Sequence, residues 1–69
     1  MTLIEIGKQI GERRRSLHLR QEDVAEMSGV TARTIYSIEE GTGNPSYNTL
    51  NKLCGTLGFE LQIEIKKVS

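Results

Sequence analysis

Cys54 and His18 are the two side chains in this 69-residue sequence whose groups suit nucleophilic, redox or metal chemistry, and each stands alone. A catalytic nucleophile needs a base beside it, and a structural zinc site needs several thiolate or imidazole ligands. The sequence has neither arrangement, nor a glycine loop that would cradle phosphate. We therefore expect no enzyme activity, no metal and no cofactor. Cys54 is predicted to be a small buried hydrophobe, and His18 a solvated turn residue.

A run of three arginines, residues 13–15, offers a different chemistry, the neutralisation of phosphate. Consecutive residues of a helix point about 100° apart, so these three cannot form one patch. Arg14 is the exception, because it lies on the apolar stripe of its segment, four residues after Ile10 and three before Leu17.

The net charge of zero conceals an uneven distribution along the chain. Residues 1–20 hold five basic and two acidic side chains, whereas residues 21–58 hold two basic and five acidic ones. A neutral balance weakens non-specific attraction to nucleic acid more than it weakens binding at a specific site. A nucleic-acid partner therefore remains compatible with the composition.

Helical periodicity predicts four short helices that position these residues. Their expected ranges are 3–17, 21–28, from the N-cap Thr31 to Gly41, and from the N-cap Ser46 to Gly58. Packing is expected from Ile6, Ile10, Leu17, Val24, Ala25, Met27, Ile35, Ile38, Tyr47, Leu50, Leu53 and Leu57. Beyond Gly58 the period changes to two, because Phe59, Leu61, Ile63 and Ile65 alternate with polar residues. That alternation predicts a half-buried strand.

The segment from Gln21 to Ile38 has the small and apolar residues that two tightly crossed helices require. The segments that carry a resemblance are Gln21-Glu22-Asp23-Val24-Ala25, Ser28-Gly29-Val30-Thr31, Ile35-Tyr36-Ser37-Ile38-Glu39, Gly41 and Asn44-Pro45-Ser46. In this register the chain resembles the Cro/C1-type, or XRE, family of helix-turn-helix proteins over residues 5–58. The resemblance implies a mainly α, lambda-repressor-like bundle of four to five helices over residues 1–58. Residues 59–69 would add a C-terminal β-strand.

The family's DNA-contacting positions can be carried over residue by residue. The helix that starts after Thr31 would enter the major groove, with the preceding helix across the backbone. Ala32, Arg33 and Ser37 would then face base edges, with Tyr36 beside them on the DNA surface rather than in the core. Gln21, Thr31 and Asn44 would meet phosphates. Such an arginine can bond a guanine edge at two points, and such an alanine can contact a thymine methyl group.

Two features depart from the family pattern. Arg20 stands where relatives often have a serine or threonine cap, so that cap is missing, although Arg20 can contact phosphate instead. The loop from Thr42 to Ser46 has no lysine or arginine. The family also pairs the counterpart of Arg14 with the acid at Glu39, which predicts a structural salt bridge; direct contact of Arg14 with DNA is the alternative.

The C-terminal strand is predicted to form a dimer interface. A chain this short buries only about 60% of the surface of its unfolded form, so help from a partner is expected. The strand lacks a partner strand in its own chain, and an apolar face of Phe59, Leu61, Ile63 and Ile65 invites pairing with a second copy. The alternative is a strand that folds back on its own helices, with a dimer formed through the fourth helix or only on DNA.

These observations predict a bacterial transcription regulator of the cytoplasm, associated with the nucleoid, that binds a palindromic operator in double-stranded DNA as a homodimer. Repression is the expected action. The rival interpretation is a protein-interaction module, an adaptor or an antitoxin that binds a toxin kinase. A short XRE domain ending in a strand also resembles HipB-type antitoxin repressors, which do both. No apolar run approaches the roughly 20 residues that cross a bilayer.

Overall fold

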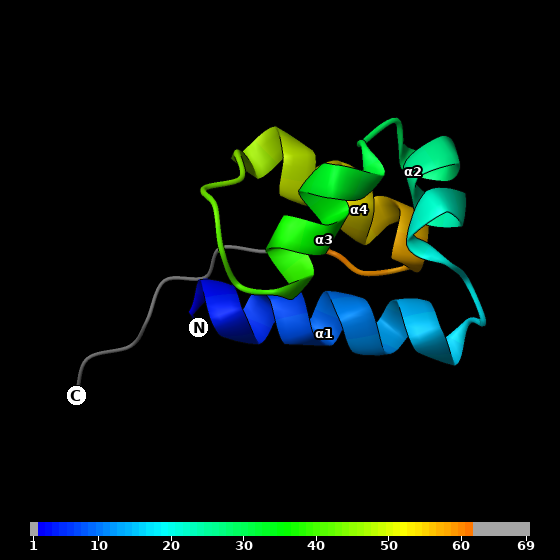
Figure 1. Cartoon of the computed structure of the whole chain (residues 1–69), viewed down its shortest axis with the longest axis horizontal. Coiled ribbons are helices and arrows are strands. Elements are labelled where there is room, and N and C mark those ends of the chain that lie inside the picture. The colour runs from blue at the N-terminus through cyan, green and yellow to red at the C-terminus, as the bar shows by residue number, and fades with distance from the viewer. Residues whose placement is uncertain (1, 62–69) are drawn as a thin grey trace.

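The computed structural model describes residues 2–61, which form four helices around one core (Figure 1). The helices are α1 (Leu3–Ser16), α2 (Gln21–Ser28), α3 (Ala32–Glu39) and α4 (Tyr47–Leu57). The expectation of a mainly α helix-turn-helix bundle is confirmed, with four helices in the described range. None of the four is long and apolar enough to cross a membrane.

The predicted C-terminal strand finds no support in the described residues. Residues 59–61 follow α4 without strand structure, and residues 62–69, including Ile63 and Ile65, lie outside the described range. A strand is defined by its ladder of hydrogen bonds to a neighbour. Residues 2–61 contain no strand with which this segment could pair.

Local capping signals fix the helix ends close to the predicted positions. The hydroxyl of Thr31 accepts a hydrogen bond from the Thr34 amide at 3.2 Å, and that of Ser46 accepts one from the Thr49 amide at 3.1 Å. Gly29 ends α2 with φ 78°, a left-handed conformation that glycine adopts without steric cost. The turn and the two N-caps are therefore encoded locally.

Arg20 precedes α2 and supplies no side-chain cap, as the sequence predicted. Asp23 compensates from inside the helix, because its carboxylate accepts a hydrogen bond from the Arg20 amide at 2.7 Å. The same carboxylate also lies in the first turn, where the helix dipole favours negative charge. Half of a capping box thus replaces the missing family cap.

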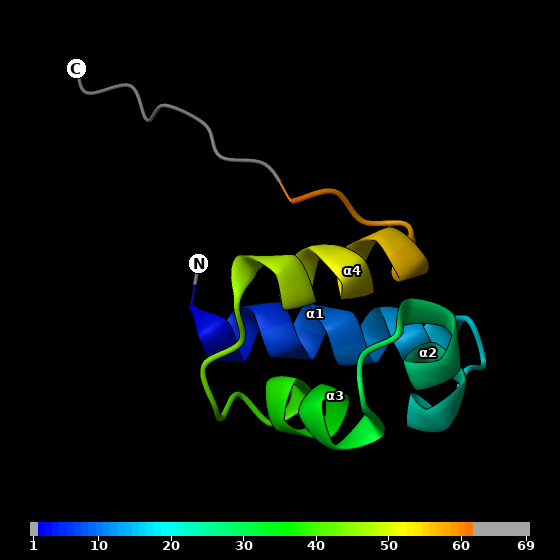
Figure 2. The ribbon, with the colours of Figure 1, turned by 90° about the horizontal axis from the view of Figure 1, so that it is seen from above.

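The helices are arranged so that α1 packs against α3 and α4. Viewed from above, α1 lies between α3 and α4, and α2 closes one end (Figure 2). Contacts join α1 to α3 and α4, and α2 to the same two helices. The side chains that are less than 2% exposed come from all four helices: Ile10, Val24, Ile35, Ile38, Leu53 and Leu57. The core therefore holds α2 and α3 together and fixes both on α1.

Three residues expected to pack are instead exposed. Leu17, the residue at the C-cap of α1, is 39% exposed. Met27 on α2 is 60% exposed, because the buried side of this short helix is taken by Val24, which is completely buried. Tyr47 at the start of α4 is 57% exposed, and the apolar stripe of that helix begins only at Leu50. The prediction that these three residues pack was wrong in each case.

The crossing of α1 and α3 depends on a glycine that the sequence analysis missed. A Cβ atom added to Gly7 would overlap the backbone carbonyl oxygen of Ile38. One turn later, a Cβ atom at Gly11 would lie 3.1 Å from Oε1 of Glu39. Two small residues four apart share one helix face, so the signal was present in the sequence. Here they let α1 approach the last turn of α3.

Candidate nucleic-acid interface

The pair α2 and α3 forms a compact helix-turn-helix unit. Three residues, 29–31, separate the helices, and the left-handed Gly29 lets the chain reverse direction at once. Val30 within the turn is 8% exposed and joins the core together with Val24 and Ile35. Apolar packing on its inner side therefore fixes the orientation of α3, while its outer side is exposed to solvent.

The outer side of α3 carries the residues predicted to read base edges. Arg33 and Tyr36 are exposed, Tyr36 by 55%, and Ala32 and Ser37 are half-buried. The inner side of the same helix holds Ile35 and Ile38. Within the described part of the chain, Arg33 makes no ion pair and no side-chain hydrogen bond, so its guanidinium donors remain available.

A shallow groove runs beside α3, between this helix and the loop before α4. Its lining includes Arg33, Ser37 and Asn44. The loop is attached to the helix by Thr42, whose amide and hydroxyl donate to the Ser37 carbonyl at 2.9 and 3.2 Å. The structure therefore brings together a predicted phosphate-contacting residue and two predicted base-reading residues.

The other residues predicted to meet phosphate lie at the ends of the helices. Thr31 is exposed at the start of α3, and its hydroxyl is engaged in capping. Arg20 forms an exposed ion pair with Asp23, in which Nη2 of Arg20 lies 3.1 Å from Oδ1 of Asp23. Hydrogen bonds from the side chain and the backbone amide of Arg20 hold the pKa of Asp23 below its ordinary value. Gln21 instead donates from Nε2 to Oε1 of Glu39 at 3.2 Å, a partner that the sequence analysis did not foresee.

Arg14 and Glu39 form the predicted salt bridge between α1 and α3. Nε and Nη2 of Arg14 lie 2.7 and 2.8 Å from Oε2 and Oε1 of Glu39, and Nη1 donates to the Leu19 carbonyl at 2.9 Å. The two side chains are only 12% and 8% exposed. With its guanidinium committed in this way, Arg14 has a structural role.

The pKa of Glu39 reflects both its burial and its partners. Burial is the largest single influence and acts to raise this pKa, but the hydrogen bonds from Arg14 and Gln21, together with the positive charges of Arg14 and Arg15, hold it below the ordinary value. The bond to Glu39 likewise raises the pKa of Arg14. The pair is therefore ionised at neutral pH.

The three consecutive arginines do not act as one patch: Arg13 reaches α4, whereas Arg14 and Arg15 both approach Glu39 of α3. Arg13 donates from Nε to the Leu57 carbonyl at 2.8 Å, which satisfies a carbonyl at the end of α4. Arg15 is 60% exposed, with Nη1 3.9 Å from Oε1 of Glu39. Arg13 and Arg14 thus join α1 to two different helices, and no arginine patch forms.

The two reactive side chains occupy the predicted environments. Cys54 is 4% exposed on α4, and burial raises the pKa of its thiol, which suits a packing role. His18 is exposed in the turn between α1 and α2, with φ 58°. Residues 2–61 contain no group of three or more histidine, cysteine or acidic side chains placed to hold a metal ion.

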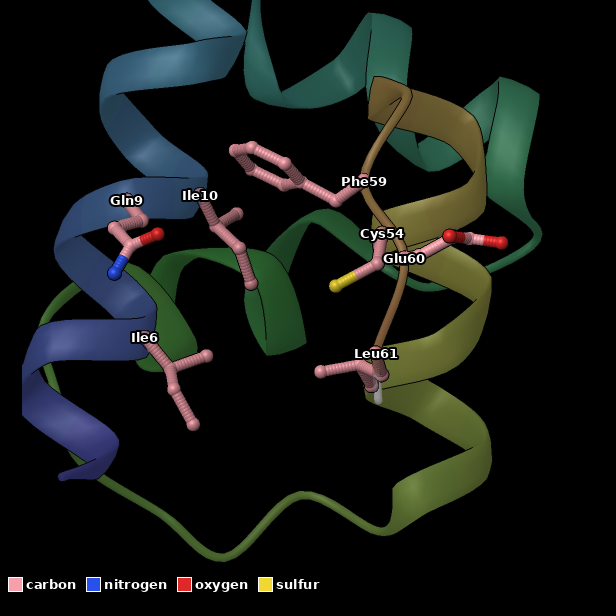
Figure 3. Close-up of a pocket in the computed structure, with 7 residues that line it drawn as sticks. All are labelled: Ile6, Gln9, Ile10, Cys54, Phe59, Glu60 and Leu61. Carbon is pink, nitrogen blue, oxygen red and sulfur yellow. The ribbon is translucent and has the colours of Figure 1, made fainter. Parts of the chain in front are cut away.

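The tail that follows α4 contributes Phe59 and Leu61, two of the four residues predicted to form a dimer interface. Both are half-buried. They line an apolar groove with Ile6 and Ile10 of α1 and with Cys54 of α4 (Figure 3). The helix bundle therefore has a second concave surface, distinct from the groove beside α3.

Comparison with known proteins agrees with this geometry. The helix-turn-helix family matches residues 10–63 of the chain. An HTH-type transcriptional regulator of Methanothermobacter thermautotrophicus is 41% identical over 51 residues, which cover 74% of each chain. The HTH-type transcriptional regulators PuuR of Escherichia coli and Shigella flexneri are 38% identical over 55 residues. That match covers 80% of this chain and 30% of PuuR, so the chain spans less than a third of PuuR.

Proposed function

Because this chain belongs to the XRE-type helix-turn-helix family, we propose that it represses transcription by binding a palindromic operator as a homodimer. DNA binding and transcription regulation follow from the family and from the relatives, which are transcriptional regulators. The proposal adds three points to these: the chain represses transcription, its operator is palindromic, and it binds as a homodimer. The bacterial cytoplasm and a toxin partner stay predictions.

The observation that carries the proposal is the division of α3 into a buried and an exposed side. An α-helix with its side chains is about 10–12 Å in diameter, so α3 fits into the major groove, which is about 12 Å wide. Arg33, in the N-terminal half of the helix, has no partner among the described residues and is free to donate two hydrogen bonds to O6 and N7 of guanine. Ala32 and Ser37 would contact adjacent bases, with Tyr36 beside them.

Phosphate contacts would set the register of the domain on DNA. We assign them to Arg20, Gln21, Thr31 and Asn44. Asn44 lines the same groove as Arg33, so a strand that bonds Asn44 would pass close to the base-reading side of α3. The loop from Thr42 to Ser46 has no basic residue, which limits the electrostatic contribution of each domain. Two domains on one operator would offset that weakness.

A twofold dimer gives the operator its expected symmetry. Pairing of residues 59–67 from two copies would make an antiparallel ribbon, and a twofold interface is self-complementary. Two recognition helices would then meet half-sites about 34 Å apart, or a multiple of that spacing. The apolar side of the ribbon would carry Phe59, Leu61, Ile63 and Ile65.

The test is selection of bound duplexes from a randomised DNA library. The protein should enrich a palindrome, and Arg33→Ala should lose preference at one base pair of each half-site while weakening binding by about 1–3 kcal/mol. Gln21→Ala is the matched control, because loss of a phosphate contact should weaken all sequences alike. A sequence preference unchanged by Arg33→Ala would contradict the proposed register of α3.

A further inference from the structure

Arg15 is the member of the arginine run whose guanidinium has no hydrogen-bond partner within the described part of the chain. Arg13 and Arg14 both donate hydrogen bonds inside the bundle. The side chain of Arg15 is 60% exposed, and its Nη1 lies 3.9 Å from Oε1 of Glu39, which is too long for a hydrogen bond. A guanidinium group stays charged in proteins and has N–H groups that only donate. Arg15 therefore presents a positive charge and available donors at the surface.

The guanidinium of Arg15 lies on the side of α1 that faces α3. A Cβ atom added to Gly11, one turn earlier, would lie 3.1 Å from both Nη1 of Arg15 and Oε1 of Glu39. The side chain of Arg15 thus folds back over Gly11 toward the last turn of α3. Because α1 lies between α3 and α4 (Figure 2), Arg15 extends toward the side on which DNA is proposed to bind, whereas Arg13 bonds the end of α4.

Three donors from α1 and α2 converge on one oxygen atom of Glu39. Its Oε1 lies 2.8 Å from Nη2 of Arg14, 3.2 Å from Nε2 of Gln21 and 3.9 Å from Nη1 of Arg15. Arg15 at the end of α1 and Gln21 at the start of α2 are therefore neighbours. Nε2 of Gln21 carries two hydrogens, so one N–H remains when the other bonds Glu39. A strand of DNA that approaches Gln21 also comes within reach of Arg15.

We propose that Arg15 binds a phosphate of the DNA backbone next to the phosphate contact assigned to Gln21. The charges support this role, because Arg14 and Glu39 form a neutral pair and leave the charge of Arg15 to attract an anion. The proposal rests on the proposed docking of α3 in the major groove. It adds a basic contact to a set in which Arg20 is the only charged residue, and so offsets in part the lack of basic residues in the loop before α4.

The salt dependence of DNA affinity measures such a contact. Each neutralised phosphate adds about 0.9 to the slope of log affinity against log salt concentration. Arg15→Gln should therefore lower the slope by about 0.9 for each bound copy of the chain, and weaken binding roughly five- to tenfold per copy at 0.1 M salt. The loss should be the same on the duplex selected from the library and on an unrelated duplex, because phosphates carry no sequence information. Arg15→Lys keeps the charge and should restore most of the slope.

The matched control is Arg13→Gln, the same chemical change two residues earlier and on the side of α4. It should leave the salt slope unchanged but lower the urea midpoint, because it removes the hydrogen bond to the Leu57 carbonyl. Arg15→Gln should do the reverse and keep the urea midpoint of the natural chain, since its side chain is exposed and makes no hydrogen bond within residues 2–61. An unchanged slope for Arg15→Gln, or an equal loss of slope for Arg13→Gln, would overturn the proposal.

Duplexes that each carry one uncharged methylphosphonate locate the contact along the strand. The natural chain should bind more weakly when the phosphate that meets Arg15 is replaced, and Arg15→Gln should be insensitive to replacement at that position. The position to which Gln21→Ala is insensitive should be the same phosphate or the adjacent one. Widely separated positions would contradict the placement of Arg15 beside Gln21.

The outcomes separate this proposal from the proposed function. If the library yields a site whose preference depends on Arg33 but Arg15→Gln keeps the natural salt slope, only the assignment of Arg15 fails. If the library yields no preferred sequence, the docking of α3 in the major groove fails, and the phosphate contact of Arg15 fails with it.

Discussion

Arg14 on α1 and Glu39 in the last turn of α3 are joined by two hydrogen bonds of 2.7 and 2.8 Å, with both side chains largely withdrawn from water. This pair links α1 to the helix that carries the residues predicted to read bases. Arg14 also bonds the Leu19 carbonyl, so it fixes the connection into α2 as well.

Removal of one member of this pair should cost more than removal of both. Arg14→Met leaves the Glu39 carboxylate buried without its main partner and should lower the free energy of unfolding by about 3 kcal/mol. Adding Glu39→Leu removes the stranded charge and should recover much of that loss. Urea denaturation of both single variants and the double variant measures the coupling. Strictly additive losses would mean that the pair contributes no interaction of its own.

The lowered pKa of Glu39 predicts a loss of stability in acid. A carboxyl group whose pKa is lower in the folded than in the unfolded state stabilises the fold above its unfolded pKa, and this contribution disappears as pH falls through the folded value. For Glu39 the loss should begin near its ordinary pKa of 4.5 and continue below it. Urea denaturation between pH 7 and pH 3 should therefore show a shallower decline for Glu39→Gln than for the natural chain. Parallel curves would contradict this assignment.

The close crossing of α1 and α3 predicts opposite effects for two glycine-to-alanine substitutions. Gly7→Ala places a methyl group against the Ile38 carbonyl, which also accepts the Gly41 amide at 3.0 Å and so cannot shift freely. We expect a net loss of about 1–3 kcal/mol, despite better helix propensity. Gly55→Ala is the matched control on α4, where no atom lies within 4 Å of the added Cβ, and should stabilise by about 0.5–1 kcal/mol. Thermal melts compare the two, and a stabilised Gly7→Ala variant would mean that the helices cross less closely.

Truncation should separate dimerisation from folding. A chain ending at Leu61 keeps Phe59, which packs against the core and whose amide bonds the Cys54 carbonyl at 2.7 Å. The truncated chain should keep its helices but sediment as a monomer at concentrations where the full chain is a dimer. Its affinity for a palindromic site should also fall, while the preferred half-site stays the same. A truncated chain that remains dimeric would move the interface to the helices.

Some features were predictable from the sequence because their signals are local. Thr31, Ser46 and Gly29 each determine a helix end through atoms a few residues away, and the helix bounds followed to within about two residues. The salt bridge of Arg14 with Glu39 was reached only through the family resemblance. The position of Arg14 on an apolar stripe marks it as unusual but does not name its partner.

Other features depend on tertiary packing, and the sequence alone did not predict them. The sequence shows that Gly7 and Gly11 share one helix face, but the helix that approaches them is known only when α3 is placed against α1. The bond from Gln21 to Glu39 joins residues 18 apart in sequence. Met27 occupies a helix of eight residues, and two turns give a periodicity too short to define which side is buried.

The separation of the two sides of α3 has an evolutionary consequence. Ile35, Ile38 and Glu39 hold the helix in place, while the exposed Arg33 and Tyr36 contribute little to that attachment. Substitutions at such exposed positions usually change stability by less than about 0.5 kcal/mol. Duplicated copies of this gene could therefore diverge in operator preference through a few surface replacements, without repacking the core. The same property makes α3 a suitable place to graft a new DNA specificity.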